Sequence, residues 1–447
     1  MTDQAVVVIG AGSTGEAFVS AFREHEPETP ITVVERELVG GECSYYACMP
    51  TKGLLRPLEA VHAARRVPGA AEAVTGDVDA GRVFWHRDQI TGSLDDSAQE
   101  EWLAAKGAEL VRGQARVVEP GLVEAAGRPM AYDRLVVATG SVPAIPPLPG
   151  LDDVEYWTNR EASQVRAIPE SIAIVGGGPV GCEFAQLFCR MGARVALIDA
   201  APRLLSRDDA EAGQLLAETL EEEGVELHLG GGITRVAAGV EVMLESGATV
   251  KAERLLIATG RRANVDDLGL QALGVTVSKR GVEVDQRLCA ADGVWAIGDV
   301  TGIAMFTHVG KYHARIAAAD MAGVTSVADH TAIPAVTFTD PQVASVGRTV
   351  GDGLVFGSRR VDQLPRTSTY ERPKRPGLLK LAADPGRGVL VGAVAVGPEA
   401  GEWLGQLTLA IRAGVPIDVL RDTIQPYPTF SESIFAALLE LESALEG

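Results

Sequence analysis

Short runs of β-branched residues alternate with glycine-rich turns and helical patterns along this chain. The first run, at 5–9, reads Ala-Val-Val-Val-Ile and predicts a buried strand. Gly10-Ala11-Gly12-Ser13-Thr14-Gly15 follows it, then a helical pattern over 16–23 and a second strand at 31–35 that ends in Glu35. This order of strand, glycine turn, helix and strand predicts a parallel βαβ unit.

The same order returns in the middle of the chain. A strand at 171–175 is followed by Gly176-Gly177-Gly178-Pro179-Val180-Gly181, a helix to Met191, and a strand at 195–199 that ends in Asp199. The segments 132–140 and 255–260 both end in Ala-Thr-Gly. The chain therefore predicts an internal repeat of about 165 residues, with a dinucleotide-binding domain in each copy.

The remaining segments predict further elements around this repeat. Helices are expected at 54–66 and 97–106, with a Gly- and Ala-rich connection between them, and a Pro-rich linker is expected at 142–149. A strand at 294–299 precedes a helix at 305–319. After residue 329 strands and helices mix without a glycine fingerprint, at 333–347, 378–381, 389–396, 402–413, 417–423 and 431–445.

The whole pattern predicts an α/β protein with two Rossmann-like dinucleotide-binding domains in tandem and a C-terminal α+β domain. We expect the first dinucleotide-binding domain at 1–150 and the second at 151–265. The chain would then return to the first domain at 266–328 and end in the C-terminal domain at 329–447.

Composition and charge narrow the classes of partner. The 447 residues carry a formal net charge of −20, which argues against binding to nucleic acid or to an anionic membrane surface. No run of 18 apolar residues predicts a membrane span, and the start of the chain lacks the basic segment of a secretory leader. Five cysteines are too few for a secreted disulfide framework, so we expect a reducing cytoplasm.

Both glycine turns have the dinucleotide fingerprint in its required context. Their glycines admit a pyrophosphate to the helix N-terminus, where free N–H groups and the helix dipole favour an anion. Glu35 would accept a hydrogen bond from an adenosine ribose. Asp199, at the matching position of the second copy, favours NADH over NADPH because it repels a 2′-phosphate, although Arg203 lies four residues on.

The stretch 40–52 holds two cysteines, Cys43 and Cys48, followed by Pro50 and Lys52. Residues five apart on a regular helix lie about 7.5 Å apart along its axis. A disulfide needs closer Cα atoms, so this pair can bridge only where the helix start is distorted, and Pro50 favours such a distortion. The positive charge of Lys52 would stabilise a nearby thiolate. Zinc is not expected, because no second Cys/His pair has suitable spacing.

Together these motifs resemble the pyridine nucleotide–disulfide oxidoreductases, the flavoprotein family of glutathione reductase, dihydrolipoamide dehydrogenase and mercuric reductase. The resemblance covers nearly the whole chain. It rests on both glycine fingerprints, both Ala-Thr-Gly segments, and four further motifs: Gly-Gly-x-Cys-x4-Cys-x-Pro-x-Lys at 40–52, Gly-Arg-Arg-Ala-Asn at 260–264, Gly-Asp at 298–299, and Phe-Thr-Asp-Pro-Gln-Val-Ala-Ser-Val-Gly at 338–347.

The resemblance implies FAD on the first domain, NADH or NADPH on the second, and a homodimer through the third, with each active site completed by the partner chain. It implies that Cys48 lies beside the flavin and that Cys43 attacks a small-molecule substrate. It also implies that Lys52 pairs with Glu183. The implied cofactor-binding residues are Gly10, Gly12, Ser13, Thr14, Gly15, Glu35, Arg36, Gly41, Glu42, Lys52, Ala115, Ala138, Thr139, Gly140, Ser141, Arg262, Gly298, Asp299, Thr307, Gly176, Gly178, Pro179, Val180, Gly181, Asp199, Ala258 and Gly260.

The chain departs from the family near its end. The family motif His-Pro-Thr-x-Ser-Glu, whose histidine is the acid–base group, here reads Tyr427-Pro-Thr-Phe-Ser-Glu432. A phenol is a poor base at neutral pH. We therefore treat Tyr427 and Glu432 as candidate catalytic residues, with a capping box from Thr429 to Glu432 as the alternative role for Glu432.

Two functions stay open at this point. The first is reduction of a small disulfide by NAD(P)H through flavin and the Cys43–Cys48 pair. The second is reduction of a quinone or metal ion at the same centre, since a tyrosine in this place is similar to mercuric reductase. Against efficient mercury reduction, the chain shows neither a C-terminal cysteine pair nor an N-terminal Cys-x-x-Cys domain. Tyr45 and Tyr46 either pack the loop or stack on a flat substrate.

Overall fold

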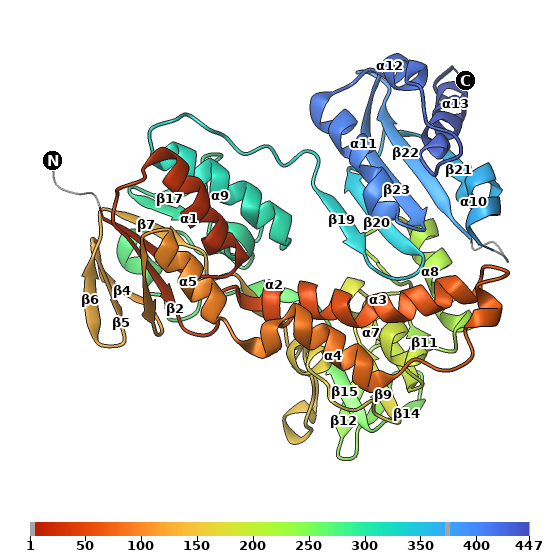
Figure 1. Ribbon diagram of the computed structural model, residues 1–447, viewed down its shortest axis with the longest axis horizontal. Coiled ribbons are helices and arrows are strands. Elements are labelled where there is room, and N and C mark those ends of the chain that lie inside the picture. The colour runs from red at the N-terminus through yellow and green to blue at the C-terminus, as the bar shows by residue number, and fades with distance from the viewer. Residues whose placement is uncertain (1–4, 372–375, 447) are drawn as a thin grey trace. The chain divides into compact units, whose positions relative to one another are not determined.

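The structure, a computed structural model, describes residues 5–371 and 376–446. The first four residues, on which the expectation of no leader partly rests, lie outside this part. The chain forms two compact units (Figure 1). Unit 1 comprises the described residues up to Thr51 together with Trp85–Ala144 and Gly260–Asp329. Unit 2 comprises Lys52–Phe84, Ile145–Thr259 and the described residues from His330 onward.

Unit 1 is built on a six-stranded sheet that is parallel except at one edge. Its strands lie in the order β17 (Cys289–Ala291), β18 (Val294–Ala296), β7 (Arg134–Val137), β1 (Val6–Ile9), β2 (Ile31–Glu35) and β3 (Ala108–Arg112). All four residues of β1 are buried, as a central strand covered on both faces requires. Helices α1 (Ser13–His25) and α9 (Thr307–Met321) lie side by side against this core (Figure 1).

Smaller elements complete unit 1. An antiparallel sheet contains β4 (Arg116–Glu119), β5 (Leu122–Ala125) and β6 (Arg128–Ala131), and β8 (Ser141–Pro143) pairs with β16 (Arg261–Ala263). Helix α5 (Ser97–Ala105) packs on β3, and the short helix α2 (Gly41–Tyr45) packs against α1.

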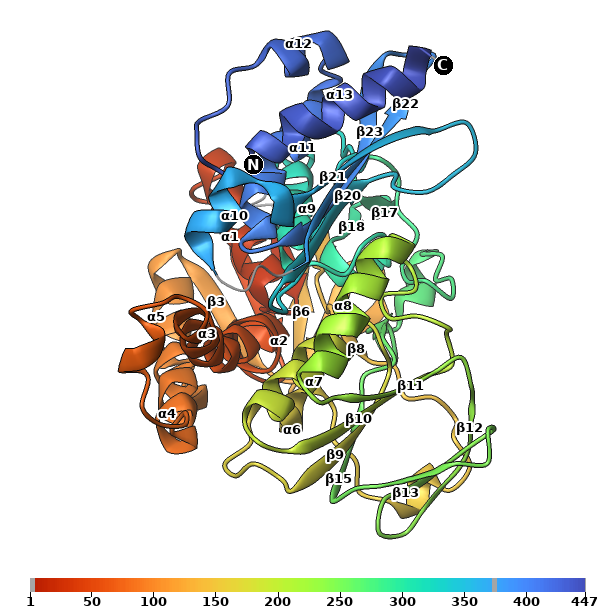
Figure 2. The same cartoon turned by 90° about the vertical axis from the view of Figure 1, so that its right-hand side faces the viewer.

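Unit 2 repeats this arrangement around a four-stranded parallel sheet. The order is β11 (Glu226–Leu229), β10 (Arg194–Asp199), β9 (Ser171–Val175) and β15 (Arg254–Ile257), with α7 (Pro179–Arg190) and α8 (Ala210–Glu222) packed on it (Figure 2). An antiparallel sheet of β12 (Ile233–Ala237), β13 (Glu241–Leu244) and β14 (Thr249–Lys251) follows β11 in the chain, as β4–β6 follow β3 in unit 1. The repeat therefore includes the small sheets as well as the glycine turns.

The last part of unit 2 is an antiparallel sheet covered by helices. Its strands lie in the order β19 (Pro334–Thr337), β20 (Gln342–Gly347), β23 (Val389–Gly397), β22 (Leu378–Asp384) and β21 (Val355–Arg360). Leucine, valine and alanine side chains of the central strands form one apolar core with the covering helices. These helices are α10 (Pro365–Tyr370), α11 (Ala400–Ala413), α12 (Ile417–Asp422) and α13 (Glu432–Glu446).

The expected fold class is confirmed. The Gly- and Ala-rich connection expected between the helices at 54–66 and 97–106, however, contains a further helix. Helix α3 (Cys48–Arg65) is followed by α4 (Ala80–Ile90). The Asp79 carboxylate accepts a hydrogen bond from the Arg82 amide and so caps α4, whose Val83 and Phe84 are buried. Further short helices are α6 (Asn159–Ser163) and the 3₁₀ turns at Ala71–Ala73, Gly92–Leu94, Leu151–Asp153, Leu270–Leu273, Gly298–Thr301 and Val361–Gln363.

Candidate active site and dinucleotide sites

The two glycine turns have the same geometry for the same reason. Gly10 has φ +104°, and a Cβ there would lie 2.4 Å from the Ala138 carbonyl oxygen. Gly176 has φ +116°, and its Cβ would lie 2.4 Å from the Ala258 carbonyl oxygen. Each Ala-Thr-Gly segment therefore passes directly over the first glycine of its fingerprint, which explains why the two motifs occur together in both copies.

The third glycine of each fingerprint brings helix and turn into contact. A Cβ on Gly15 or Gly181 would lie 2.1 Å or 1.8 Å from the carbonyl oxygen of the first glycine. The middle glycines face open space instead, since a Cβ on Gly178 meets no atom within 4 Å and one on Gly12 meets only the Gly41 Cα, at 4.0 Å.

Both helix starts can receive a phosphate. No side chain caps α1 at Gly12 or α7 at Gly178. Ser13 and Thr14 open α1, and Pro179 and Val180 open α7. The free N–H groups, the helix dipole and the uncovered middle glycine fit the pyrophosphate of a dinucleotide at each place.

The acidic residue at the end of each second strand accepts hydrogen bonds from the backbone of its own glycine turn and of the residues that follow the strand. Glu35 accepts hydrogen bonds from the Ala11 and Glu37 amides, both at 2.8 Å. Asp199 accepts from the Gly177 and Ala201 amides. Each carboxylate oxygen keeps lone pairs for a ribose hydroxyl. Arg36, which follows Glu35, pairs with Glu37 and Gln114 at the surface.

The Arg203 guanidinium is hydrogen-bonded within its own loop. It donates to the carbonyl oxygens of Leu205, Ser206 and Asp208 at 2.7–3.1 Å. In this arrangement the arginine holds the loop that follows β10.

A polar cluster in unit 1 surrounds the expected ribityl site. The Ser141 hydroxyl donates to Asp299 at 2.6 Å and accepts from Arg261 Nε at 2.7 Å, and Arg261 also pairs with Glu42 at 3.3 Å. Burial raises the pKa of the Asp299 carboxyl. An acid placed here fits a hydroxyl-rich ligand, to which it can offer acceptor oxygens.

The remaining residues expected at the FAD site frame this cluster. Thr139 and Asn264 exchange two hydrogen bonds, at 2.6 and 3.1 Å. Gly140 and Gly298 have φ +71° and +77°, and Ala115 is buried. Arg262, expected to bind FAD, is half exposed and pairs with Asp266, whereas its neighbour Arg261 enters the cluster.

The cysteine pair lies at a break between two helices. Cys43 is in α2, which ends at Tyr45, and Cys48 is the first residue of α3. Pro50 has no N–H to offer the Tyr46 carbonyl, where the break lies. The two sulfurs are not joined in a disulfide, and hydrogen bonding to Cys48 together with burial raises the pKa of the Cys43 thiol. The Cys48 sulfur lies 3.4 Å from the Thr307 hydroxyl.

Lys52 and Glu183 form the ion pair that the resemblance implies, at 2.8 Å. Glu183 lies in the first turns of α7 and is 5% exposed. Its second oxygen accepts from the Phe338 amide at 2.9 Å, and the Lys52 ammonium lies 4.5 Å from the centre of the Phe338 ring. Phe338 was part of a family motif in the sequence, but nothing in its spacing indicated this role.

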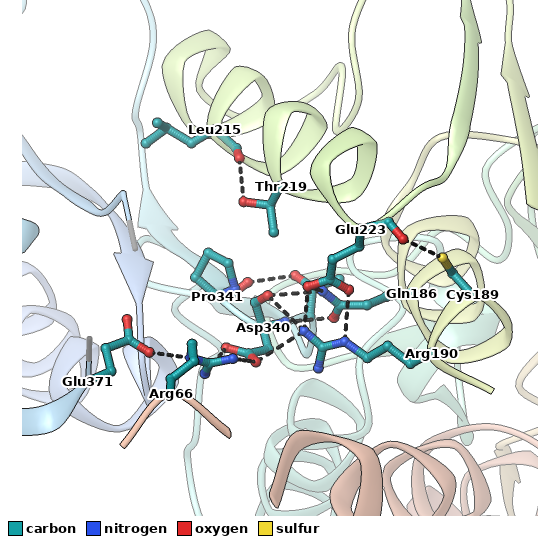
Figure 3. A network of polar contacts seen from close by, with 11 residues as sticks. Arg66, Gln186, Cys189, Arg190, Leu215, Thr219, Glu223, Asp340, Pro341 and Glu371 are labelled. Carbon is teal, nitrogen blue, oxygen red and sulfur yellow. Dashed lines mark hydrogen bonds and ion pairs between the residues drawn. The ribbon is translucent and has the colours of Figure 1, made fainter. Parts of the chain in front are cut away.

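Two further side chains of α7 hold the turn that follows Phe338. Gln186 exchanges hydrogen bonds with the backbone of Asp340, at 2.8 and 2.9 Å. Arg190 binds Glu223 through two nitrogens and Asp340 through one (Figure 3). Arg66 reaches Asp340 and Glu371 from the other side, as the figure shows. The buried charges of this network are thereby paired.

The tyrosine in the place of the family histidine is exposed. The Tyr427 side chain is 73% exposed, while the Glu432 carboxylate accepts from the Thr429 amide at 3.3 Å. That bond is one half of the expected capping box. The Thr429 hydroxyl donates to the Pro426 carbonyl oxygen. Of the two loop tyrosines, Tyr45 is buried, which supports the packing role.

Two negative findings concern the described residues. Within residues 5–371 and 376–446, no three His, Cys, Asp or Glu side chains gather as a metal ion would require. No helix in this part of the chain is both long and apolar enough to cross a membrane.

Comparison with known proteins gives matches along the whole chain. The family described as pyridine nucleotide-disulphide oxidoreductase matches residues 4–320, and its dimerisation domain matches residues 333–438. A mercuric reductase of Acidithiobacillus ferrooxidans is 33% identical, covering 96% of this chain and 81% of its own. A dihydrolipoyl dehydrogenase of Thermus scotoductus is 32% identical, covering 97% of this chain and 96% of its own.

Among solved structures, the Cu(II) complex of the HOCl-induced flavoprotein disulfide reductase RclA from Escherichia coli is similar. It aligns with a TM-score of 0.84 at 25% identity and covers 96% of this chain and 98% of its own. The structural similarity therefore includes the six-stranded sheet of unit 1 and the four-stranded and five-stranded sheets of unit 2.

Proposed function

This chain belongs to the pyridine nucleotide-disulphide oxidoreductase family, and we propose that it uses NADH to reduce a small disulfide. Membership of a flavin–dithiol oxidoreductase family confirms the expectation drawn from the motifs. Members generally use FAD with NADH or NADPH. The observation that carries the finer proposal is that Cys43 and Cys48 are hydrogen-bonded to each other across a helix break, in the unit that holds the first glycine turn.

The first glycine turn and the Asp299 cluster fit FAD, and the second turn fits a nicotinamide dinucleotide. Glu35, Ser141 and Asp299 would hold the ribose and ribityl hydroxyls. Bound FAD supplies two-electron chemistry between a nicotinamide and a disulfide. The chain itself contributes the open helix starts, a polar cluster around Asp299, and a thiol pair whose two members both interact with Thr307. Cys43 would be the member that meets the substrate.

The choice of NADH rests on Asp199 and Arg203. Asp199→Ser removes the negative charge that opposes a 2′-phosphate, so we expect the ratio of kcat/KM for NADH over NADPH to fall about tenfold or more. Arg203→Gln is the matched variant: it should loosen the loop yet leave the ratio within about twofold, since Arg203 is held by carbonyl oxygens. A large shift with Arg203→Gln would contradict the assignment.

Anaerobic titration of the holoenzyme with NADH tests the whole proposal. We expect a long-wavelength absorbance band from the Cys48 thiolate beside the flavin, which Cys48→Ser abolishes and Cys182→Ser, a buried core thiol, leaves unchanged. Turnover of a small disulfide should follow in the native protein. Absence of the band in the native protein would overturn the role of the pair.

A second function is favoured by the names of the relatives. Several are mercuric reductases, and the RclA structure is a Cu(II) complex. Two thiolates suit a soft metal ion and need no imidazole base, which agrees with Tyr427. Steady-state rates with a small disulfide, Cu(II), Hg(II) and a quinone decide between the two. A metal-ion rate at least tenfold above the disulfide rate would establish this alternative.

A further inference from the structure

One buried histidine of unit 1 binds the backbone beside the expected ribityl site. His313 lies in α9, and its side chain is 0% exposed. Its Nδ1 atom accepts a hydrogen bond from the backbone N–H of Gly298 at 3.1 Å. A backbone N–H can only donate, so Nδ1 carries the lone pair and the neutral ring has its hydrogen on Nε2. The imidazole therefore serves as an acceptor for the main chain of Gly298.

Side chains bind both polar backbone groups of Gly298. Its carbonyl oxygen accepts from the Thr301 hydroxyl at 2.8 Å, while its N–H donates to His313. Gly298 has φ +77°, and a Cβ there would lie 2.8 Å from the Thr14 hydroxyl oxygen. The glycine thus has no side chain by which it could be held, and the hydrogen bonds of its backbone help to hold the turn.

Close packing brings α9 to this turn. A Cβ on Gly310, one turn before His313 in α9, would lie 2.1 Å from the same Thr14 hydroxyl oxygen. Helix α9 also packs against α1, which carries Thr14, and against the turn at Gly298–Thr301. The packing of α9 therefore sets the place of His313 relative to Gly298.

The residue after Gly298 is the acid expected to bind the ribityl chain. The Asp299 carboxylate accepts from the Ser141 hydroxyl at 2.6 Å. Gly298 and Asp299 share one peptide plane, so a rotation of that plane would also redirect the Asp299 side chain. Without an acceptor at His313, the buried N–H of Gly298 would be unpaired, which costs free energy and favours another conformation of the turn.

We propose that His313 is a positioning residue for FAD, which holds the Gly298 N–H and thereby places the Asp299 carboxylate for the ribityl hydroxyls. The proposal rests on the function proposed above, in which FAD binds to unit 1. In this role the imidazole acts through Asp299, and it exchanges neither a proton nor an electron.

Two substitutions of similar size separate positioning from packing. The Oδ1 atom of asparagine is bonded to Cγ, as Nδ1 is in histidine, so His313→Asn keeps an acceptor for Gly298. His313→Leu has a methyl group in that place. If His313 positions the turn, His313→Leu is the more damaging change. If His313 only fills the core, His313→Asn is the more damaging, because an amide costs more to bury than a methyl group.

The test is the rate at which the diluted holoenzyme releases FAD, followed by flavin fluorescence. We expect His313→Leu to raise this rate about tenfold or more and His313→Asn to leave it within about threefold of the native rate. Met321→Leu and Met321→Asn, at a buried apolar position of the same helix, are the control pair. There asparagine should give the lower denaturation midpoint.

A double substitution shows whether His313 acts through Asp299. Asp299→Asn alone should speed the release of FAD, and His313→Leu added to it should change the rate by less than about threefold. His313→Gln, whose amide lies one bond farther from the backbone, gives a second comparison if His313→Leu does not fold. It should release FAD faster than His313→Asn.

Three results would overturn the role of His313. They are release from His313→Asn at least as fast as from His313→Leu or His313→Gln, a native rate in His313→Leu, and an undiminished effect of His313→Leu in Asp299→Asn. If the native rate persists in His313→Leu while the native holoenzyme shows the NADH-induced band, only the role of His313 fails. A native protein that binds no FAD would contradict the proposed function itself.

Discussion

Glu183 shows how one carboxylate serves two parts of unit 2. One oxygen holds Lys52 of α3 and the other holds the backbone of Phe338, while the Phe338 ring supports the same ammonium. Only 5% of the residue is exposed. Its charge is therefore tolerated because both partners are fixed, and removing one partner should cost more than an ordinary surface pair.

Lys52→Met should destabilise the holoprotein by about 1–3 kcal/mol, because Glu183 is left buried with a single neutral donor. Glu183→Gln should cost less, since an amide can still accept from Phe338. Denaturant midpoints of both variants measure this order. Lys251→Met, which removes an exposed pair with Glu241, serves as control and should shift the midpoint very little. Equal midpoints for Lys52→Met and Lys251→Met would contradict the argument.

His62 gives unit 2 a defined response to acid. Burial first, and then the charge of Arg190, lower the pKa of His62 to about 4. The unfolded chain takes up the proton near pH 6.5 and the folded chain does not, so stability is full above pH 6.5 and falls as the pH drops toward 4.

Between pH 6.5 and pH 4 the protonation of the unfolded chain at His62 should lower the free energy of unfolding by about 1–3 kcal/mol, and His62→Gln should remove this loss. Denaturant midpoints at pH 7 and pH 4.5 for the native protein and the variant give the difference. His25→Gln, at an exposed position, is the matched control. A variant that loses stability with acid as steeply as the native protein would show that another group carries the effect.

Residue roles differed in how far the sequence could indicate them. The pairing of Lys52 with Glu183 followed from the family resemblance, because each residue stands at a fixed place in a motif that the sequence matches. The roles of Arg261 and Phe338 did not follow. Arg261 and Arg262 are adjacent and identical in type, and only the alternation of β16 decides which one faces Ser141.

At the scale of elements, helix α7 combines two tasks on one short segment. Its first turn is open at Gly178, where a dinucleotide phosphate fits. Three of its side chains, from Glu183 to Arg190, hold the turn between β19 and β20. Figure 3 shows two of them, Gln186 and Arg190, at Asp340. Contacts within the protein therefore hold the start of α7 in place, and no ligand is needed for this.

Gly178→Ala tests the first task in isolation. The glycine has φ −80°, which alanine adopts freely, and its Cβ would meet no protein atom within 4 Å. We expect an unchanged denaturation midpoint and an increase of about tenfold or more in KM for NADH, because the methyl group occupies the space of the pyrophosphate. Gly181→Ala should instead destabilise the protein. An unaltered KM in Gly178→Ala would place the phosphate elsewhere.

The elements that the sequence predicted best were those with strong periodicity. Both βαβ units, α9 and the C-terminal helices lie within a few residues of their expected ranges. The sequence did not predict helix α4, because its apolar face is short, lies among polar residues, and follows Gly81 near the start of the helix. The sheets β4–β6 and β12–β14 were missed because their strands have only three to five residues each, too few for a clear alternation.

At the scale of the whole molecule, the C-terminal domain exposes apolar side chains that a monomer would not need. Phe435 and Leu439, one turn apart on α13, are 44% and 46% exposed, and Leu409 of α11 is 67% exposed. The matching family domain is a dimerisation domain. These side chains are the ones we expect to meet the partner chain.

Phe435→Glu combined with Leu439→Glu should give a monomer in light scattering, because two charges would be buried in the interface. Flavin reduction by NADH should persist within about twofold, while disulfide turnover falls about tenfold or more because the partner no longer completes the site. Val118→Glu, an exposed position on β4, is the control. A dimer that survives the double substitution would exclude this face of α13 from the interface.

The break at Tyr46 and Ala47 has a consequence for the speed of the redox cycle. Because Cys43 and Cys48 belong to separate helices, we expect each helix to keep its backbone hydrogen bonds when the two sulfurs join. Opening and closing the bond then requires rotation about side-chain torsions and little movement of the main chain. The reorganisation energy of electron transfer should accordingly be small, so that neither redox state has to rebuild the scaffold that receives the next pair of electrons.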